Sequence, residues 1–322
     1  MVIRSLFSNY HIIMSYPLSI IIPCYNSEQY IVSCVTSLFI QTYHDWEAIF
    51  VNDGSKDNTL NILTNYALQD QRIKMYSQSN QGTAKAREYG ISKATGDFIT
   101  FLDVDDTLQE NALEQMLRAF DEDTDIVVSG FNIVKGQSVR RKILHPCKLP
   151  SMDYLKKVLC GKYGWELCAK MYRKELFTTS IKITQGIRIG EDAAVFIQLV
   201  CASRQVKILS EQVYNYIQYA QSASHIRSEK YAEETLQAAF FIEDILKNTH
   251  YYQKIKPEID AMFLLFYSNS TRRSILGAAH PFVRTIMRKH FKFSAITRIP
   301  LYKAIYVLLI YCLSLVKSSN YE

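Results

Sequence analysis

The 322-residue chain has few glycines, few prolines and no regularly spaced cysteines. Eleven glycines and seven prolines are too few for a collagen-like or low-complexity sequence. The seven cysteines are odd in number and form no C-x-x-C pair, which argues against a disulfide framework and a zinc site. Hydrophobic residues make up 48% of the chain and charged residues 21%, which excludes a disordered chain and a polytopic membrane protein.

Three motifs of common enzyme classes are also missing. No G-x-x-x-x-G-K-[ST] occurs, so the chain is not a P-loop NTPase. No G-x-G-x-x-G follows the first predicted strand, which argues against a dinucleotide-dependent dehydrogenase, and no G-x-S-x-G elbow is present. The first 14 residues lack the pattern of a secretory signal, so we expect a cytoplasmic protein with free, mostly buried cysteines.

Positive charge is concentrated at the end of the chain. The formal net charge is +6, and residues 271–322 contain nine Lys/Arg and one acid, 9 − 1 = +8, which leaves −2 for the rest. Such a tail suggests an anionic partner, membrane or nucleic acid, or else a solvated helical face. The uncharged run at 304–316 is shorter than the roughly 18–20 residues of a spanning helix, so it predicts an interfacial helix or a core helix.

Apolar runs alternate with helix-like segments in the first 130 residues. The predicted strands are 18–22, 47–51, 72–77, 98–102 and 125–129. The predicted helices are 28–41, a helix capped by Asp57 or Asn58 that ends near 68, 83–94 and 108–120. This alternation predicts an α/β fold with a parallel, doubly wound sheet. Residues 134–221 are mixed, and helices are predicted at 229–246, 257–276, 281–291 and after Pro300.

Polar residues follow three of the predicted strands, at 23–26, 52–55 and 103–106, and should converge on one cleft at the carboxyl edge of the sheet. Asp103 and Asp105 are two residues apart, so on extended backbone they point the same way. Crowded acids at a strand end require a cation, and oxygen ligands favour Mg²⁺ or Mn²⁺. The alternative to a cation site is that Asp106 with Thr107 caps the next helix and the other acids are solvated. Asp53 could accept from a ring N–H or a ribose hydroxyl, or only shape its turn.

Four motifs follow one another at a characteristic spacing over the first 110 residues. They are SIIIPCYN at 19–26, VNDGSKD at 51–57, NQG at 80–82 with AR at 86–87, and GDFITFLDVDD at 96–106. Together they resemble family 2 glycosyltransferases of the GT-A fold, the group that builds bacterial capsule, O-antigen and exopolysaccharide chains. The resemblance continues less tightly through 168–172, 190–192 and 214–216 and fades after about 224.

The resemblance implies roles for individual residues. The nucleotide sugar would be bound by Pro23, Tyr25, Asn26, Asp53, Gly54, Ser55, Arg87, Asp103 and Val104. Asp103 and Asp105 would form the D-x-D motif and ligate Mn²⁺ or Mg²⁺. Asp192 would be the catalytic base that takes the proton of an acceptor hydroxyl, with Glu191 orienting the site or the acceptor. The alternative for Glu191 and Asp192 is an N-cap and a first-turn acid of a helix at 193–201.

The resemblance implies a metal-dependent, inverting transfer from a nucleotide sugar, a UDP-sugar, to a glycan or lipid-linked acceptor. Two departures from the family pattern matter. Asn52 stands where many relatives have Asp, and the Q-x-x-R-W motif of processive synthases does not occur, which predicts transfer of one sugar per encounter. The alternatives are a sugar-phosphate nucleotidyltransferase and a non-catalytic module that binds glycan or nucleic acid. The intact acids argue against the latter, so no nucleic-acid partner is expected.

These expectations divide the chain into three parts. Residues 1–14 would be a dispensable leader, with Met14 as the natural start. Residues 15–225 would be the GT-A domain, with the nucleotide sugar held by about 15–130 and the acceptor by about 131–225, where Tyr163, Trp165 and Tyr214 are candidates for stacking on sugars or for the core. Residues 226–322 would be a helical, basic extension that holds the enzyme at the cytoplasmic face of the plasma membrane.

Overall fold

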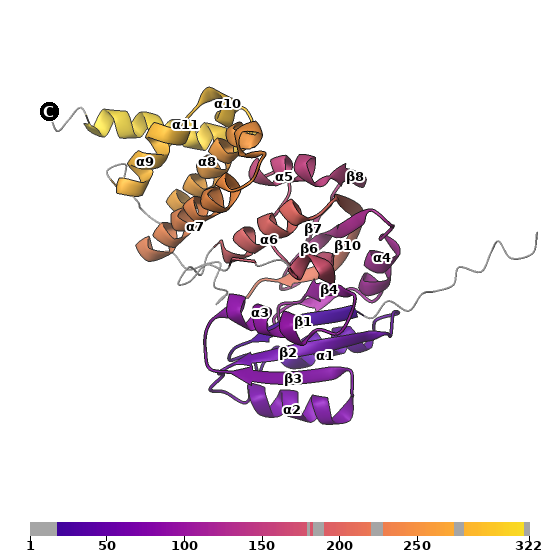
Figure 1. Cartoon of the computed structure of the whole chain (residues 1–322). Coiled ribbons are helices and arrows are strands. Elements are labelled where there is room, and N and C mark those ends of the chain that lie inside the picture. The colour runs from indigo at the N-terminus through magenta and orange to yellow at the C-terminus, as the bar shows by residue number, and fades with distance from the viewer. Residues whose placement is uncertain (1–17, 179–180, 183–189, 220–227, 274–279, 319–322) are drawn as a thin grey trace, which may run out of the picture.

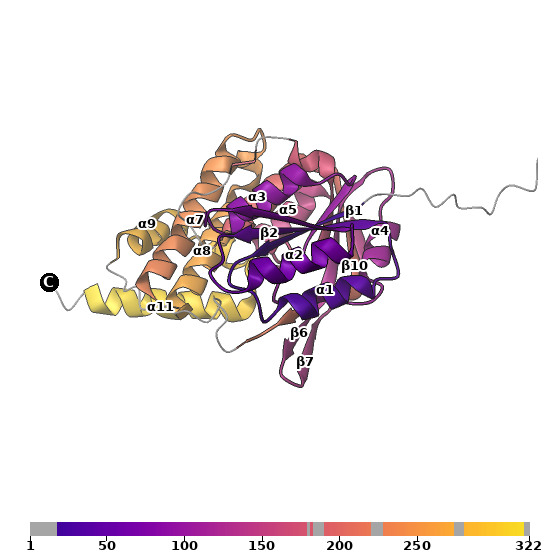
Figure 2. The same cartoon turned by 90° about the horizontal axis from the view of Figure 1, so that it is seen from below.

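The computed structural model describes residues 18–178, 181–182, 190–219, 228–273 and 280–318 (Figure 1). The predicted leader at 1–14 lies outside the described residues. One large sheet with flanking helices is followed by a group of helices, α7 to α11, on one side of the molecule (Figures 1 and 2).

The first half of the sheet is parallel, as the sequence predicts. Its strands are β1 (Leu18–Cys24), β2 (Trp46–Asp53), β3 (Ile73–Gln78) and β4 (Phe98–Phe101), in the spatial order β3-β2-β1-β4. The connecting helices are α1 (Ile31–Phe39), α2 (Thr59–Gln69) and α3 (Thr83–Lys93). Every residue of β1 and β2 is buried, because these strands are covered on both faces.

Alternation along the strands explains which helix covers which face. Ile21 and Val51 share one hydrophobic cluster with Ala86 of α3, whereas Ile20 and Phe50 share another with the apolar sides of α1 and α2. Successive strand residues point to opposite faces, so a continuous apolar run buries both. The predicted elements of this half are therefore confirmed to within a few residues at their ends.

The second half of the sheet departs from the predicted parallel order. Its strands are β9 (Lys170–Arg173), β6 (Thr124–Lys135), β10 (Gln205–Ile217), β5 (Thr107–Leu108), β7 (Ser138–Lys142) and β8 (Cys147–Pro150). β9 runs antiparallel to both β4 and β6, while β10 is parallel to β6 and antiparallel to β5. The predicted helix at 108–120 shortens to α4 (Ala112–Arg118), because residues 107–108 pair with β10 instead.

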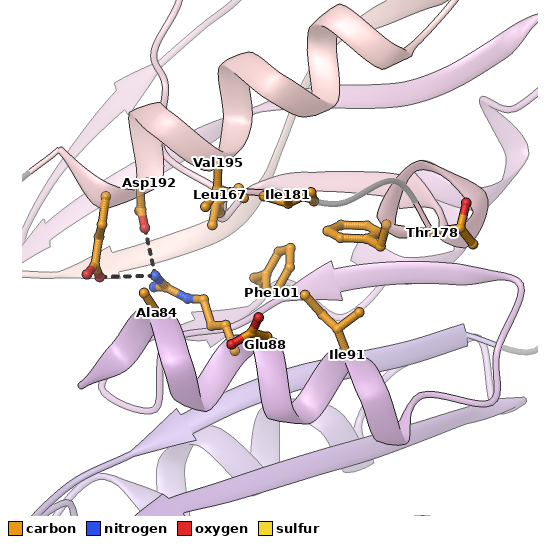
Figure 3. A pocket seen from close by; sticks show the side chains of 12 residues that line it. Ala84, Glu88, Ile91, Phe101, Leu167, Thr178, Ile181, Asp192 and Val195 are labelled. Atoms are coloured by element: carbon orange, nitrogen blue, oxygen red, sulfur yellow. Dashed lines mark hydrogen bonds and ion pairs between the residues drawn. The ribbon is translucent and has the colours of Figure 1, made fainter. Parts of the chain in front are cut away.

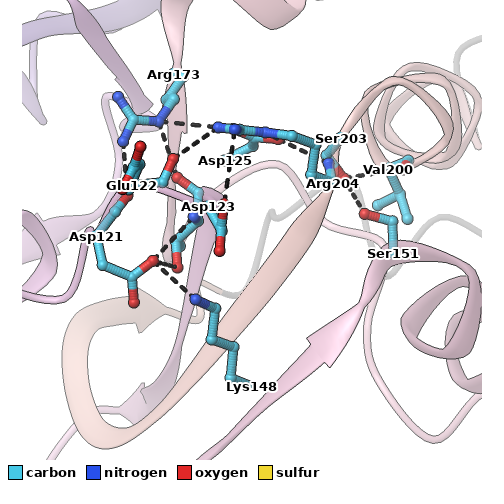
Figure 4. A network of polar contacts seen from close by, with 11 residues as sticks. Asp121, Glu122, Asp123, Asp125, Lys148, Ser151, Arg173, Val200, Ser203 and Arg204 are labelled. Carbon is cyan, nitrogen blue, oxygen red and sulfur yellow. Dashed lines mark hydrogen bonds and ion pairs between the residues drawn. The ribbon is translucent and has the colours of Figure 1, made fainter.

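An ion-pair network lies at the edge where β6 and β10 begin (Figure 4). Arg204 donates to the Asp125 carboxylate through its Nη2 atom at 2.7 Å and through its backbone amide at 2.7 Å. Arg173 of β9 donates to the Thr124 carbonyl at 2.9 Å, and Lys148 pairs with Asp121 at 2.8 Å. These bonds join β6, β8, β9 and β10 at the sheet edge opposite the carboxyl ends of the parallel strands.

The remaining helices form the C-terminal part together with α5 (Ser151–Leu159) and α6 (Glu191–Ala202). They are α7 (Glu229–Lys247), α8 (Lys256–Arg273), α9 (Pro281–His290), α10 (Phe293–Ile296) and α11 (Leu301–Ser318). Short 3₁₀ turns lie at Lys174–Phe177 and Tyr252–Ile255. In the part of the chain described, no helix combines the length and the apolar character needed to cross a bilayer.

Part of the predicted basic tail is used inside the protein. Asp260 of α8 accepts hydrogen bonds from Lys256 at 2.7 Å, His290 at 2.8 Å and Lys292 at 2.8 Å. Arg298 donates to Glu258 at 3.1 Å. Two of the tail cations, Lys292 and Arg298, therefore pair with acids of α8 and join it to the segments around α10.

Glu47 of β2 stabilises the parallel half of the sheet, and its contribution to the free energy of unfolding should depend on pH. Its carboxylate accepts from Ser19 Oγ at 2.6 Å, from the Thr95 amide at 2.6 Å and from Lys74. Burial alone would raise the pKa of Glu47, but these bonds outweigh it and lower the pKa to about 2. With an unfolded pKa of about 4.3, this difference stabilises the native state by about 3 kcal/mol at neutral pH.

Because the folded pKa is lowered, this stabilisation is complete above about pH 4.3 and declines as the pH falls toward 2. Glu47→Gln should therefore lower the free energy of unfolding at pH 7, and its difference from wild type should shrink at pH 3. Urea denaturation at both pH values measures this. A difference of equal size at pH 7 and pH 3 would show that the Glu47 charge is not the source.

Candidate active site

The acids after β4 have different environments. Asp106 is 1% exposed, and its carboxylate accepts from the Tyr214 hydroxyl and from the Ile217 amide, both at 2.7 Å. Burial and repulsion from the neighbouring acids raise the pKa of Asp106 to about 8. The alternative that Asp106 and Thr107 cap the next helix is wrong, because Thr107 lies in β5 and the N-cap of α4 is Asn111. Tyr214 is fully buried, so it belongs to the core and does not stack on a sugar.

Asp103 and Asp105 follow β4 at the carboxyl edge of the sheet. The expectation that they lie on extended backbone is wrong, because residues 104–105 form a turn in which the Asp106 amide donates to the Asp103 carbonyl at 2.9 Å. Burial and repulsion from Asp103 raise the pKa of Asp105 to about 6. Among the described residues, no group of three or more His, Cys, Asp and Glu is arranged to hold a metal. Two carboxylates nevertheless suit Mg²⁺ or Mn²⁺, which usually complete their coordination with water and substrate phosphates. The donor set fits the predicted ion.

Arg87 of α3 connects this acidic pair with the start of α6. Its side chain is 9% exposed, and it donates to Asp103 through Nη2 at 2.8 Å and to Asp192 through Nη1 at 2.6 Å. Glu191 lies 3.6 Å from the same nitrogen. The three acids stand 16 to 105 positions away from Arg87 in the sequence, and the fold gathers them around one guanidinium.

Asp192 and Glu191 occupy the first turn of α6, where the helix dipole favours negative charge. The N-cap is Gly190, with φ +88°, and a Cβ there would come within 2.6 Å of the Ala238 Cβ atom. Neither acid is thus the N-cap. Burial raises the pKa of Asp192, while Arg87 and a hydrogen bond from the Leu167 amide oppose this. Burial also raises the pKa of Glu191, to about 7.

The predicted nucleotide loops lie side by side. The Asn26 amide donates to Ser55 Oγ at 3.0 Å, and the Lys56 amide donates to Asn26 Oδ1 at 2.8 Å. Tyr25 is 47% exposed and available to a ligand. Asn52, the departure from the family pattern, accepts from the Ser55 amide at 3.1 Å and shapes this turn.

Asp53 is more involved in the protein's own structure than the sequence predicted. Its carboxylate accepts from Gln78 Nε2 and from the amides of Gln81 and Gly82, all at 2.8 Å. It therefore fixes the loop that leads into α3. Gly54, with φ +71°, lies so close to this loop that a Cβ would be 2.8 Å from the Asn80 nitrogen.

Two other predicted nucleotide-binding residues, Pro23 and Val104, have buried side chains, which leaves mainly their backbone for contact with a ligand. The two remaining aromatic candidates are half-buried. Tyr163 stacks on Tyr154 with ring centroids 5.0 Å apart, and Trp165 packs on Phe266 at 4.7 Å. The core interpretation describes both better than a role in stacking on sugars.

A cavity of about 300 Å³ adjoins the Arg87 cluster. In Figure 3, Asp192 and Thr178 lie toward opposite ends of it. Its apolar wall is formed by Ile91, Phe101, Leu167, Phe177, Ile181 and Val195. The sequence analysis missed this wall, because apolar residues of a cavity have the same local pattern as core residues.

Comparison with known proteins identifies the class. Residues 19–179 match the family model described as glycosyl transferase family 2. The chain is 32% identical over 231 residues to uncharacterized glycosyltransferase EpsJ of Bacillus subtilis (strain 168), covering 69% of this chain and 67% of that protein. The chain belongs to glycosyl transferase family 2 and is a glycosyltransferase. This favours a glycosyltransferase over the two alternatives considered from the sequence, a sugar-phosphate nucleotidyltransferase and a non-catalytic binding module.

Solved structures agree on the GT-A fold. S. aureus TarS residues 1–349 in complex with UDP has a TM-score of 0.63 and 19% identity, covering 91% of this chain and 87% of that one. The same TarS fragment has been solved with UDP-GlcNAc, with a TM-score of 0.65 and 19% identity, covering 91% and 88%. The mannosyltransferase PcManGT from Pyrobaculum calidifontis, in complex with GDP-Man and Mn²⁺, has a TM-score of 0.51 and 13% identity, covering 92% and 86%.

Proposed function

We propose that this glycosyltransferase moves one sugar from a UDP-sugar to a hydroxyl of a glycan or lipid-linked acceptor, with inversion and with Mn²⁺ or Mg²⁺, in bacterial surface polysaccharide synthesis. The observation that carries the proposal is the Arg87 cluster, which joins the D-x-D acid Asp103 to Asp192 through bonds of 2.8 and 2.6 Å. The UDP and UDP-GlcNAc complexes of TarS support the choice of donor, and the Mn²⁺ complex of PcManGT supports the cation.

In this proposal Asp192 is the general base. Displacement at an anomeric carbon requires the acceptor hydroxyl to lose its proton, and a carboxylate within hydrogen-bond reach can take it. Burial makes Asp192 more basic than an exposed aspartate, and Arg87 keeps its charged form accessible. Glu191, 3.6 Å from the Arg87 nitrogen, orients the cluster or the acceptor.

Asp103 and Asp105 hold the cation, which when bound offsets the negative charge that grows on the departing diphosphate. The loops at 23–26 and 52–55 with Asp53, Gly54, Ser55 and Val104 hold the nucleotide. The proposal assigns the donor to about residues 15–130 and the acceptor to about 131–225.

The test is hydrolysis of the donor without acceptor. The purified chain is incubated with Mn²⁺ and a panel of UDP-, GDP-, dTDP- and CMP-sugars, and free nucleotide is measured. We expect slow release from a UDP-sugar that stops with EDTA. If no donor is hydrolysed, calorimetry with UDP follows, and the absence of both hydrolysis and UDP binding would overturn the proposal.

The proposal also places the enzyme peripherally at the anionic, cytoplasmic face of the plasma membrane. α11 exposes a row of apolar side chains on one side, with Phe293 nearby at 82% exposure. The row consists of Leu301, Tyr302, Ile305, Leu308 and Leu309. These residues recur at helical spacing, and the tail around them is basic, as in helices that lie in the membrane interface.

Replacing Leu301 and Ile305 by serine should move the protein from the pellet to the supernatant when it is sedimented with phosphatidylglycerol vesicles. Each change removes an apolar side chain worth about 1.5–3 kcal/mol when buried in the interface. The matched control is Leu60→Ser with Leu68→Ser on α2, which are exposed apolar residues of another helix. Equal sedimentation of both double variants and wild type would remove the membrane claim and leave the enzyme claim unchanged.

A further inference from the structure

A hairpin formed by β6 and β7 projects from the body of the protein (Figure 2). Its register runs from Phe131 opposite Lys142 to Lys135 opposite Ser138. β10 continues beside it, with Tyr214 opposite Phe131 and Ile217 opposite Val134. The hairpin is therefore supported on one side by the strand whose Ile217 amide binds Asp106.

The topology sets this hairpin beyond the carboxyl edge of the sheet. β4 and β6 are both antiparallel to β9, so they run in the same direction and end at the same edge. Asp103 follows β4 at that edge. Residues 131–135 of β6 extend further by about 3.3 Å each, or about 17 Å in all.

The segment that contains the hairpin is strongly basic. Between Asp125 and Asp153 the sequence has no acidic residue, and it has five basic ones, Lys135, Arg140, Arg141, Lys142 and Lys148. Lys148 pairs with Asp121 at the opposite edge of the sheet, and Lys142 pairs with Glu166. Among the residues that the structure describes, none forms an ion pair with Lys135, Arg140 or Arg141, which are exposed.

Strand alternation sorts these cations between two faces. Arg140 and Lys142 are two residues apart and share a face with Ser138 and its partner Lys135. We call Lys135, Arg140 and Lys142 the basic face. Arg141 points to the other face, where its cross-strand partner is Asn132.

The basic face is the one connected to the candidate base. Lys142 Nζ lies 4.6 Å from the centroid of the Phe131 ring and 3.2 Å from Glu166 Oε1. Glu166 directly precedes Leu167, which lines the same cavity as Asp192. The basic face thus begins next to the cavity that Asp192 lines and continues outward along the hairpin.

We propose that the basic face binds a phosphate group of an anionic acceptor and so holds the acceptor hydroxyl toward Asp192. The inference rests on the proposed function and adds the chemical class of the acceptor. Guanidinium and ammonium groups recognise phosphate through charge-assisted hydrogen bonds. The donor diphosphate is assigned to the cation at Asp103 and Asp105, so the cations of the projecting hairpin are left for phosphate on the other substrate.

The experiment compares Arg140→Gln with Arg141→Gln. The two residues are adjacent and exposed and lose the same charge, but they lie on opposite faces. Binding is measured by fluorescence anisotropy with a labelled isoprenyl diphosphate and with a labelled glycerol-phosphate oligomer, which separate a lipid carrier from a polymer as the source of the phosphate. Sedimentation with phosphatidylglycerol vesicles forms the third arm, and calorimetry with UDP controls for the fold and the donor site.

We expect Arg140→Gln to weaken binding of one phosphate probe about tenfold, the loss of one charge-assisted hydrogen bond. Arg141→Gln should stay within about twofold of wild type, and UDP binding should be unchanged in both variants. Equal losses in both variants would indicate diffuse electrostatics and overturn the proposal. No loss of binding in either variant would also overturn the proposal. If Arg140→Gln weakened only the binding to vesicles, the hairpin would be a membrane contact and the proposal would again be wrong. If the wild-type protein did not bind UDP, that result would instead contradict the proposed function.

Discussion

Replacing Asp192 with asparagine should lower the rate of sugar transfer by about a thousandfold, within the range expected for removal of a general base. Asparagine has nearly the same shape, and its carbonyl oxygen can still accept from Arg87 Nη1, which donates to Asp192 at 2.6 Å. What it cannot do is take the proton of the acceptor hydroxyl. Transfer is measured with a radiolabelled UDP-sugar at saturating acceptor, and UDP affinity is measured by calorimetry.

Glu88→Gln is the matched control for this variant. Glu88 lines the same cavity, but its side chain is 49% exposed and pairs with Lys85 on the surface of α3. We expect this variant to transfer within about twofold of wild type, as for most exposed charges. If Asp192→Asn retained full activity, the base would have to be another group. If it lost UDP affinity as well, the change would have disturbed the donor site through Arg87.

Replacing Asp105 with asparagine should reduce transfer by about a hundredfold or more, since metal ions supply several kcal/mol of stabilisation to the transition state. The variant should also need a higher Mn²⁺ concentration for half-maximal donor hydrolysis. A titration with Mn²⁺ measures both effects. Glu110→Gln, at an exposed acid a few residues further on, should leave the Mn²⁺ dependence unchanged.

The stability of the Asp105 variant separates a ligand from a structural residue. Burial and the negative charge of Asp103 oppose the Asp105 charge, so removing it relieves repulsion in the metal-free protein. We therefore expect the thermal midpoint in EDTA to stay the same or rise. A clear fall in the midpoint together with an unchanged Mn²⁺ requirement would contradict the assignment of Asp105 to the cation.

Several features of the site could be predicted from local sequence. The acids after β4 and the turn after β2 follow buried apolar strands, and parallel strands end at a common edge, so their convergence follows from the pattern. The contacts of Asn26 with Ser55 and Lys56 agree with this expectation.

Other features could not be predicted, because they depend on contacts between distant segments. Asp106 and Tyr214 are 108 positions apart, and only the folded chain brings them together as a buried, hydrogen-bonded pair. The antiparallel strand β9 inserts between β4 and β6, although nothing in its own four residues indicates that position. The carboxylate of Asp53 is likewise occupied by a loop 28 and 29 residues away.

The sequence by itself determined the parallel half of the sheet, the helical end of the chain and the family, because burial periodicity and short motifs are local properties. Only the tertiary structure decided that Arg87 joins Asp103 to Asp192 and that the basic face of the hairpin begins next to the cavity that Asp192 lines. The physical reason is that a charge is placed by whichever segments fold around it. Coulombic and hydrogen-bonded partners are selected by distance in space, and that distance is fixed only when the strands take their order in the sheet.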